Sequence, residues 1–241
     1  MKSCLRNVFL FILIVGGGGI LLLGYLGLFP SVSRILGSDK PRDLGIKYTQ
    51  TNLEEGKRKT GVEIKILPIG GILGVTIQYL GQHKVDKQFD SEEVTAIANN
   101  SPWKFYPFSG LQIKFNKDGN VELTGILLTD RIISYITATG GSRFNIAGVM
   151  EKIKLPKGNI PFYIEANGGV NNDKVNLNIQ KVELGRLPIP QSLYTSSKGY
   201  VDNFAEERMR FVKGLSVKSV KIENGQLNFI GTLPDFEALE K

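Results

Sequence analysis

The chain has almost none of the side chains from which disulfides and zinc sites are built. Its 241 residues include one cysteine, Cys4, and one histidine, His83. No disulfide can form within the chain, and a catalytic zinc ion usually needs three protein ligands, which no H-E-x-x-H motif or cysteine cluster supplies. We therefore expect no metal and no cofactor. About 200 residues are enough for a hydrophobic core without such cross-links.

Catalytic motifs are equally scarce. A Ser-His-Asp triad would have to use His83, and no G-x-S-x-G motif is present. The strand pattern around His83 predicts an ordinary surface residue. Neighbouring carboxylates such as Glu92-Glu93 and Glu206-Glu207 fall on helical patterns, where solvation explains them. A hydrolase that uses carboxylates alone stays an alternative, but the sequence favours a protein that is not an enzyme.

One long hydrophobic run stands out against this background. Residues 8–29 contain no charged side chain, and a helix of roughly 22 residues reaches about 33 Å, enough to cross the hydrocarbon core of a bilayer. The alternative is a cleaved signal peptide, whose apolar stretch is usually shorter and ends at a small-residue cleavage site. The sequence predicts a single-pass anchor, with residues 1–7 as a cytoplasmic tail.

The charges near the run do not decide its orientation, because basic residues lie on both sides of it. A short tail before a first hydrophobic segment is typical of a signal anchor, so we expect the body to lie outside the cytoplasm. An extracytoplasmic domain without disulfides fits a bacterial cell envelope. Cys4 precedes the run, and it is either a site of reversible acylation or an unmodified thiol.

The formal net charge of +7 comes from scattered lysines, and residues 57–59 form the only tight basic run. Nucleic-acid binding is not predicted, because no basic stripe is interleaved with aromatic residues. The basic surface either attracts anionic headgroups and wall polymers weakly or is simply solvated.

After the hydrophobic run, residues 30–50 are polar and rich in glycine and proline, which predicts a spacer. Residues 51–241 then predict a single α+β domain. Thr51-x-x-Glu54 and Asp90-x-x-Glu93 are capping boxes that predict two helices, the first closed by Gly61. Alternating apolar residues predict strands at 62–66 and from 75 to about 89.

Two segments that begin with a turn resemble each other. Residues 118–127 and 224–233 each carry a D-G or N-G turn followed by a returning strand, which predicts two hairpins. They are either an internal duplication or two independent hairpins. A third hairpin is predicted from residue 161 to residue 179, and the three together indicate an antiparallel sheet with one buried face.

Helical patterns separate these hairpins. Short helices are predicted near residues 132–136 and over 144–153, and the longest is predicted from Gln191 to Lys213, closed by Gly214. The predicted architecture is a curved antiparallel sheet packed on a long C-terminal helix, with one N-terminal transmembrane helix.

Three segments carry a family resemblance. Residues 89–94 and 182–190, followed by a helix, resemble the YpmS-like membrane-anchored proteins of Gram-positive bacteria, and residues 214–225 resemble the end of LmeA-type envelope proteins. Both families have a tubular lipid-binding (TULIP-like) architecture. The resemblance covers roughly residues 85–233 and implies an extracytoplasmic domain that shelters an acyl or polyprenyl chain. It implies no catalytic residue.

The best candidate binding residues are aromatic. Residues 103–108 read WKFYPF, and they either seal the core or grip a lipid tail at the rim of a groove, whose floor would be the apolar face of the long helix. The candidate ligand-binding residues are Trp103, Phe105, Phe108, Tyr200, Val201 and Phe204. Two functions stay open: an envelope domain that binds or hands over lipid, and a structural module with a filled core that docks another envelope protein.

Overall fold

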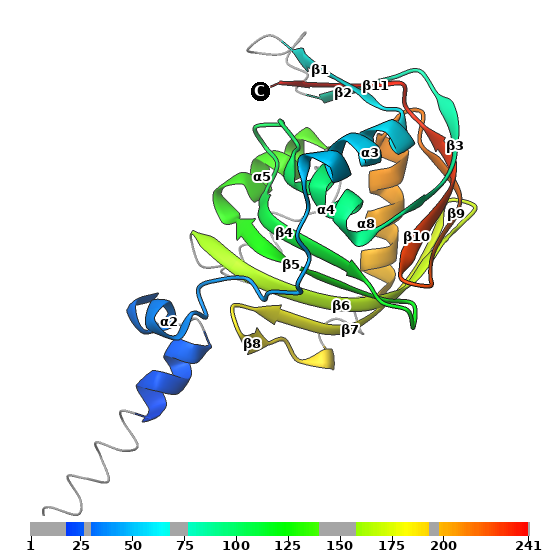
Figure 1. Ribbon diagram of the computed structural model, residues 1–241. Coiled ribbons are helices and arrows are strands. Elements are labelled where there is room, and N and C mark those ends of the chain that lie inside the picture. Colours follow the sequence, from blue (N-terminus) through cyan, green and yellow to red (C-terminus); the bar gives the residue numbers. More distant parts are fainter. Residues whose placement is uncertain (1–17, 27–29, 68–76, 140–157, 193–197, 241) are drawn as a thin grey trace, which may run out of the picture.

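The computed structural model describes residues 18–26, 30–67, 77–139, 158–192 and 198–240. An eight-stranded antiparallel sheet curls into a half-barrel, a three-stranded sheet lies across one end of it, and helices line the space between them (Figure 1). The predicted α+β class and the curved antiparallel sheet are therefore confirmed.

The half-barrel is organised around one long strand. The strand β6 carries β5 and β4 on one edge and β7 and β8 on the other. The bounds of these strands are Phe108–Phe115 for β4, Asn120–Leu128 for β5, Asn159–Asn171 for β6, Lys174–Leu184 for β7 and Leu187–Pro188 for β8.

A second group of strands forms the other wall. The strands β3 (His83–Phe89), β10 (Gln226–Leu233) and β9 (Ser216–Glu223) pair in that order, and β9 joins the sheet through Val170 and Asn171 of β6. Just before that junction the chain is crowded by backbone on both sides. A Cβ at Gly168 would lie 2.0 Å from the Asn176 carbonyl oxygen, so only glycine fits where β6 changes neighbours.

The three predicted hairpins are all present. Their turns use left-handed backbone, with φ of 88° at Gly119, 79° at Gly225 and 49° at Asn172. A Cβ on Gly119 would lie 3.7 Å from the Ile222 carbonyl oxygen, and one on Gly225 would lie 3.4 Å from the Phe115 carbonyl oxygen. The turns of the two similar hairpins therefore lie beside each other's strands.

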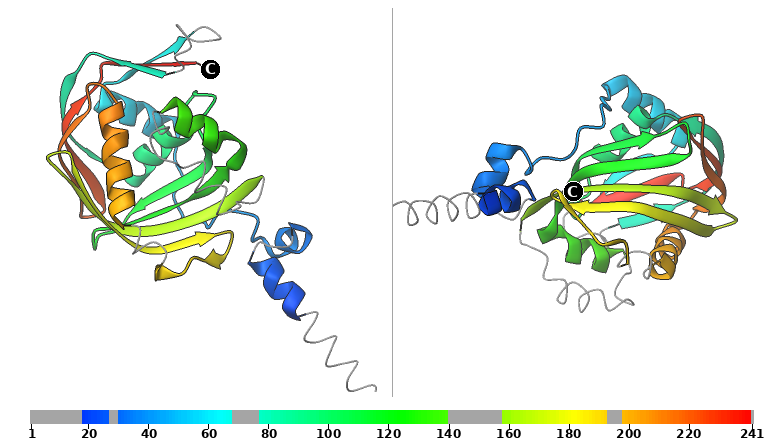
Figure 2. Two further views of the ribbon diagram at one scale, coloured as in Figure 1. Left: turned by 180° about the vertical axis from the view of Figure 1, so that it is seen from behind. Right: turned by 90° about the horizontal axis from the view of Figure 1, so that it is seen from below.

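Three further helices lie between the curled sheet and the small sheet (Figure 2). They are α3 (Gln50–Thr60), α4 (Ser91–Asn99) and α5 (Thr129–Ala138). The capping box at Asp90 and Glu93 is confirmed, and Gly61 ends α3 at φ 67°. The first predicted capping box is wrong, because the N-cap of α3 is Thr49, whose side chain pairs reciprocally with Asn52.

The small sheet closes one end of the molecule. Its middle strand β11 (Phe236–Glu240) lies parallel to β1 (Glu63–Leu67) and antiparallel to β2 (Ile77–Leu80). The predicted strand over 75–89 is therefore interrupted, and β2 and β3 meet at a corner. The turn predicted at Pro68 to Gly74 lies outside the described residues.

His83 stands at this corner and is not the plain surface residue that the sequence predicts. Its Nδ1 lies 2.9 Å from the Asp235 carboxylate and its Nε2 lies 2.8 Å from the Thr60 carbonyl oxygen. The Asp235 carboxylate also accepts a hydrogen bond from the Gln82 amide at 3.0 Å. The histidine thus joins α3 to the bend between the two sheets.

The predicted long C-terminal helix is not seen at that length. The described helix α8 spans Lys198–Phe211, while residues 191–192 are helical and 193–197 lie outside the described residues. The helix ends at Phe211, three residues before Gly214, so the predicted stop at Gly214 is wrong; Gly214 adopts φ 86° in the turn that follows. The helix predicted over 144–153 also lies outside the described residues.

The N-terminal part contains a helix at residues 18–25 and α2 (Pro30–Leu36). The hydroxyls of Ser33 and Ser38 both donate to the Gly24 carbonyl oxygen, which folds α2 back on the preceding helix. Within the residues that the structure describes, no helix combines the length and the hydrophobicity needed to span a bilayer. Residues 8–17 and 27–29 of the predicted anchor lie outside them.

Residues 39–48, which we call the strap, follow α2 and lie against the outer face of the sheet (Figure 1). The Leu44 amide donates to the Gln112 side chain at 2.8 Å and the Arg42 amide donates to Thr124 Oγ1 at 3.1 Å. The Arg42 guanidinium makes two hydrogen bonds to Glu183, at 2.7 and 2.9 Å, and lies over the ring of Tyr163. These four partners form one row across β4, β5, β6 and β7, so the predicted spacer is bound to the body.

Candidate functional site

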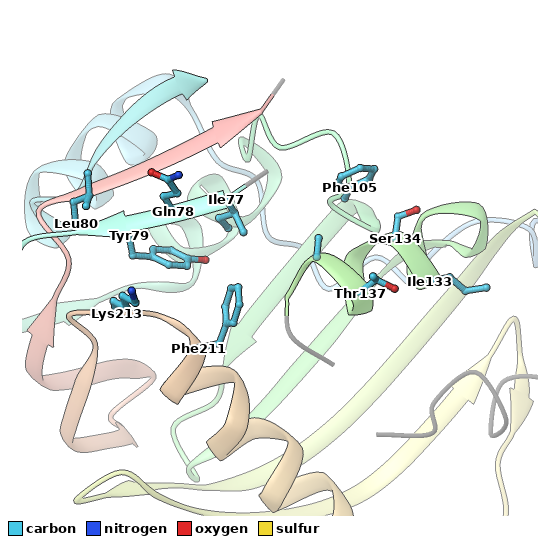
Figure 3. A pocket seen from close by; sticks show the side chains of 11 residues that line it. Ile77, Gln78, Tyr79, Leu80, Phe105, Ile133, Ser134, Thr137, Phe211 and Lys213 are labelled. Atoms are coloured by element: carbon cyan, nitrogen blue, oxygen red, sulfur yellow. The ribbon is translucent and has the colours of Figure 1, made fainter. Parts of the chain in front are cut away.

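A cavity of about 820 Å³ lies between the small sheet, α5 and the end of α8 (Figure 3). Pockets for small ligands typically have volumes of roughly 300–1,000 Å³. Three separate parts of the chain supply most of its walls. The lining residues are Ile77, Gln78, Tyr79, Leu80, Phe105, Ile133, Ser134, Thr137, Ala138, Phe211 and Lys213.

Strand alternation decides which residues of β2 face the cavity. Ile77 is buried, and Tyr79 extends from the same face of the strand toward α8. Its ring meets the ring of Phe211 edge to face, with the centroids 6.1 Å apart. Leu80 and Ile133 are 55% and 60% exposed, so large aliphatic side chains also stand at the solvent-facing part of the lining.

The wall behind the cavity is a cluster around the only tryptophan. Trp103 is 4% exposed and packs with Ile77 and Leu239. Its ring lies 5.8 Å from that of Phe105 and 5.6 Å from that of Tyr135. Its indole N–H has no hydrogen-bond partner among the described residues. Of the two alternatives for this tryptophan, the structure places it in the core.

The other predicted ligand-binding residues fall in different places. Phe105 lines the cavity, whereas Phe108 lies on β4 and contacts the ring of Phe162 at 5.8 Å. Val201 and Phe204 are half-buried on α8 but do not line the cavity. The side chain of Tyr200 lies outside the described residues. The structure therefore places Phe105 in the cavity lining with Trp103 packed behind it in the core, and separates Phe108, Val201 and Phe204 from the cavity.

Sequence reasoning missed most of the lining. Tyr79 and Phe211 were visible only as members of a strand and a helix pattern, and Ser134 and Thr137 carried no signal at all. The useful signal was periodicity: Tyr79 follows Ile77 by two residues on a strand, and Thr137 follows Ser134 by three on a helix. Periodicity identifies the face of each element but not the element that it meets.

Burial shapes the electrostatics around the cavity. It raises the pKa of the Tyr79 hydroxyl well above its usual value, and the charge of Glu237 acts in the same direction. Burial also raises the pKa of the Glu237 carboxyl and lowers that of the Arg208 guanidinium. The Tyr79 hydroxyl therefore stays protonated at neutral pH, as a hydrogen-bond donor beside an apolar space.

The helix α8 is attached to the free edge of β7 by carboxylates. Asp202 accepts a hydrogen bond from the Leu177 amide at 3.1 Å, and Glu206 accepts one from the Val175 amide at 3.2 Å. Lys198 donates to the Leu177 carbonyl oxygen at 2.6 Å. An unpaired strand edge is prone to pairing with other chains, so α8 protects this edge while it carries Phe211 to the cavity.

Replacing Asp202 and Glu206 together with alanine should loosen α8 from β7. The Val175 and Leu177 amides would lose their acceptors, and we expect their hydrogen exchange to accelerate by at least about tenfold, since a hydrogen bond to a charged group contributes about 1.5–3 kcal/mol. Hydrogen–deuterium exchange mass spectrometry measures this. Glu207→Ala is the matched control, because Glu207 lies on the same helix and pairs with Arg210 rather than with β7, and equal protection in both variants would contradict the attachment.

The described residues contain no group of three or more His, Cys, Asp or Glu side chains able to hold a metal ion. The comparisons with known proteins add no assignment: no protein-family model, no curated protein and no solved structure matches this chain. The resemblance to YpmS-like and LmeA-type proteins stays a prediction.

Proposed function

We propose that this protein is a membrane-anchored envelope domain that binds a lipid acyl chain in the cavity between β2, α5 and α8. The observation that carries the proposal is an apolar cavity of about 820 Å³ with exposed Leu80 and Ile133 in its lining. Apolar pockets with a few polar groups are the usual form of small-molecule sites. Ser134 and the Tyr79 hydroxyl are such polar groups.

The inner face of the half-barrel supports the same proposal. Cross-strand rows on that face are aliphatic, for example Leu123, Ile164 and Val182, and all three side chains are only half-buried. Buried aliphatic side chains pack against many neighbours in a filled core. The aliphatic side chains of this row keep part of their surface exposed, and a flexible acyl chain would find apolar surface along them.

The proposal also includes the membrane. Residues 8–29 would hold the chain in the cell membrane, with the body on the extracytoplasmic side, and no nucleic acid takes part. The strap supports a defined placement of the body, because Arg42 and Gln112 fix the segment that follows α2 to the sheet.

A docking module is the second candidate, and one observation favours it. The strand β1 is an edge of the small sheet, and its Ile64 and Ile66 are 36% and 55% exposed. Exposed apolar side chains on an edge strand are typical of a surface that pairs with another protein. This function needs no open cavity, so ligand binding separates the two candidates.

A fluorescent fatty acid tests the proposal on the full-length chain. Trp103 is the only tryptophan and packs against the lining residue Phe105, so energy transfer from Trp103 to cis-parinaric acid reports bound probe, and variants of the lining assign the probe to this cavity. Replacing Ser134 and Thr137 with phenylalanine fills the cavity from α5, and we expect it to weaken binding by at least about tenfold, since side chains three apart on a helix share one face.

Asp130→Phe is the matched control, because Asp130 is exposed on the same helix and does not line the cavity. We expect it to bind the probe like the unmodified chain. If the unmodified chain shows no saturable energy transfer, the lipid-binding proposal is wrong and the docking module is favoured. Equal binding by the double variant would place the probe elsewhere.

A further inference from the structure

Arg208 lies beside the cavity, over the lining residue Phe211, and carries a positive charge without an ion-pair partner among the described residues. Its guanidinium lies 4.9 Å from the centroid of the Phe211 ring and 5.7 Å from that of Tyr135, and it donates a hydrogen bond to the Thr139 carbonyl oxygen. No ion pair joins it to a carboxylate of the described residues, although Glu206 and Glu207 of the same helix pair with Arg210. The guanidinium offers five N–H donors, and it stays charged at every physiological pH.

The surroundings make this charge unusual. Arg208 is half-buried, and burial lowers its pKa, which means that the site disfavours the charged form that the side chain nevertheless keeps. A buried charge is costly unless a partner compensates it. The faces of Phe211 and Tyr135 supply part of that compensation through cation–π contacts, but they supply no hydrogen-bond acceptor.

Two further charged residues, Lys213 and Glu237, lie near the cavity. Lys213, a second cation, is exposed and lines the cavity two residues after the end of α8. The acidic group nearest to Tyr79 is Glu237, which lies beside it on the neighbouring strand β11. Glu237 shares the face of the small sheet on which Tyr79 lies, and burial raises the pKa of its carboxyl, which favours the neutral form.

We propose that the cavity selects amphiphiles with an acidic headgroup, a carboxylate or a phosphate, and that Arg208 is the residue that binds this group. The inference rests on the proposed function and specifies its ligand. The acyl chain lies among Ile77, Phe105 and Ala138, and the headgroup completes the hydrogen bonding of the guanidinium, with Lys213 as a second positive charge. A guanidinium matches two oxygens of a carboxylate or phosphate at once.

The test compares an acid with its neutral ester on the full-length chain. Energy transfer from Trp103 measures binding of cis-parinaric acid and of its methyl ester, which has the same chain without the charge. We expect the acid to bind at least about tenfold more tightly, as a charge-assisted hydrogen bond requires. Arg208→Gln should weaken binding of the acid to the level of the ester and leave binding of the ester unchanged.

Matched variants assign the effect to this residue. Arg210→Gln removes an arginine from the same helix that points away to Glu206 and Glu207, and we expect it to keep the preference for the acid. Arg208→Lys keeps the charge and should retain part of the preference for the acid. If Arg208→Gln does not fold, this partial preference tests the role of Arg208 instead. A preference that survives in folded Arg208→Gln would overturn the assignment to Arg208.

Two further outcomes separate this inference from the proposed function. If acid and ester bind the unmodified chain equally, the headgroup inference is wrong while lipid binding stands. If neither binds, both are wrong. Inorganic phosphate, acetate and palmitic acid serve as competitors of the probe. Phosphate and acetate would displace the probe from a site for free anions, whereas only palmitic acid would displace it from a site for amphiphiles. Displacement by phosphate alone would contradict the lipid headgroup.

Discussion

Trp103→Ala should lower the free energy of unfolding by about 3–5 kcal/mol, the usual cost of truncating a large buried aromatic side chain. The indole is 4% exposed and packs with Ile77 and Leu239, each also almost fully buried. Its removal takes away apolar burial and leaves a space that the surrounding β2, β11 and α5 cannot close without moving. The same space would merge with the neighbouring cavity.

Urea unfolding followed by far-ultraviolet circular dichroism measures this change, since the variant has no tryptophan to follow by fluorescence. Trp103→Phe is the control. It keeps a ring against Phe105 and Tyr135 and also removes the indole N–H, which has no partner among the described residues. We expect it to cost clearly less than alanine. A loss below about 1 kcal/mol in Trp103→Ala would contradict a core position and return this residue to the groove.

Arg42→Met should lower the free energy of unfolding by about 2–3 kcal/mol. Breaking a buried ion pair typically costs about 3–5 kcal/mol, and we expect less here because the Arg42 side chain is 36% exposed. Glu183 would stay 3% exposed with Lys181 as its remaining cation, at 3.1 Å. The strap would also lose its bidentate attachment, so its amide protons should exchange faster than those of the sheet.

A double variant distinguishes this pair from general damage. When both partners of a buried pair are replaced by apolar side chains of similar size, the cost is often small. Arg42→Met with Glu183→Met should therefore be more stable than Arg42→Met alone. If the stability loss of the double variant equals the sum of the losses of Arg42→Met and Glu183→Met, the two side chains do not act as a pair.

Local features of this chain could be predicted from the sequence because they depend on few residues. The turns at Gly119 and Gly225 and the capping box at Asp90 and Glu93 are each determined within four positions. The start of α3 was misplaced because Thr49 pairs with Asn52, and asparagine is not the residue that the capping-box pattern seeks at that position. Both threonines are plausible caps by local rules alone.

Long-range features could not be predicted in this way. Arg42 and Glu183 are separated by 141 residues, and nothing around either indicates the other. The cavity also depends on contacts between distant parts of the chain. Its lining residues Tyr79, Thr137 and Phe211 come from a strand and two helices that meet only because the half-barrel curls. The aromatic run at residues 103–108 was the strongest local signal, yet it divides between core, lining and sheet.

Native mass spectrometry of the purified full-length chain, released from detergent, tests the central claim most directly. We expect the unmodified chain to retain a lipid with an acidic headgroup. We also expect the variant with phenylalanine at positions 134 and 137 to lose this lipid while it keeps its fold. Chain without bound lipid in both proteins, or the same lipid bound equally to both, would contradict an acyl-chain site between β2, α5 and α8.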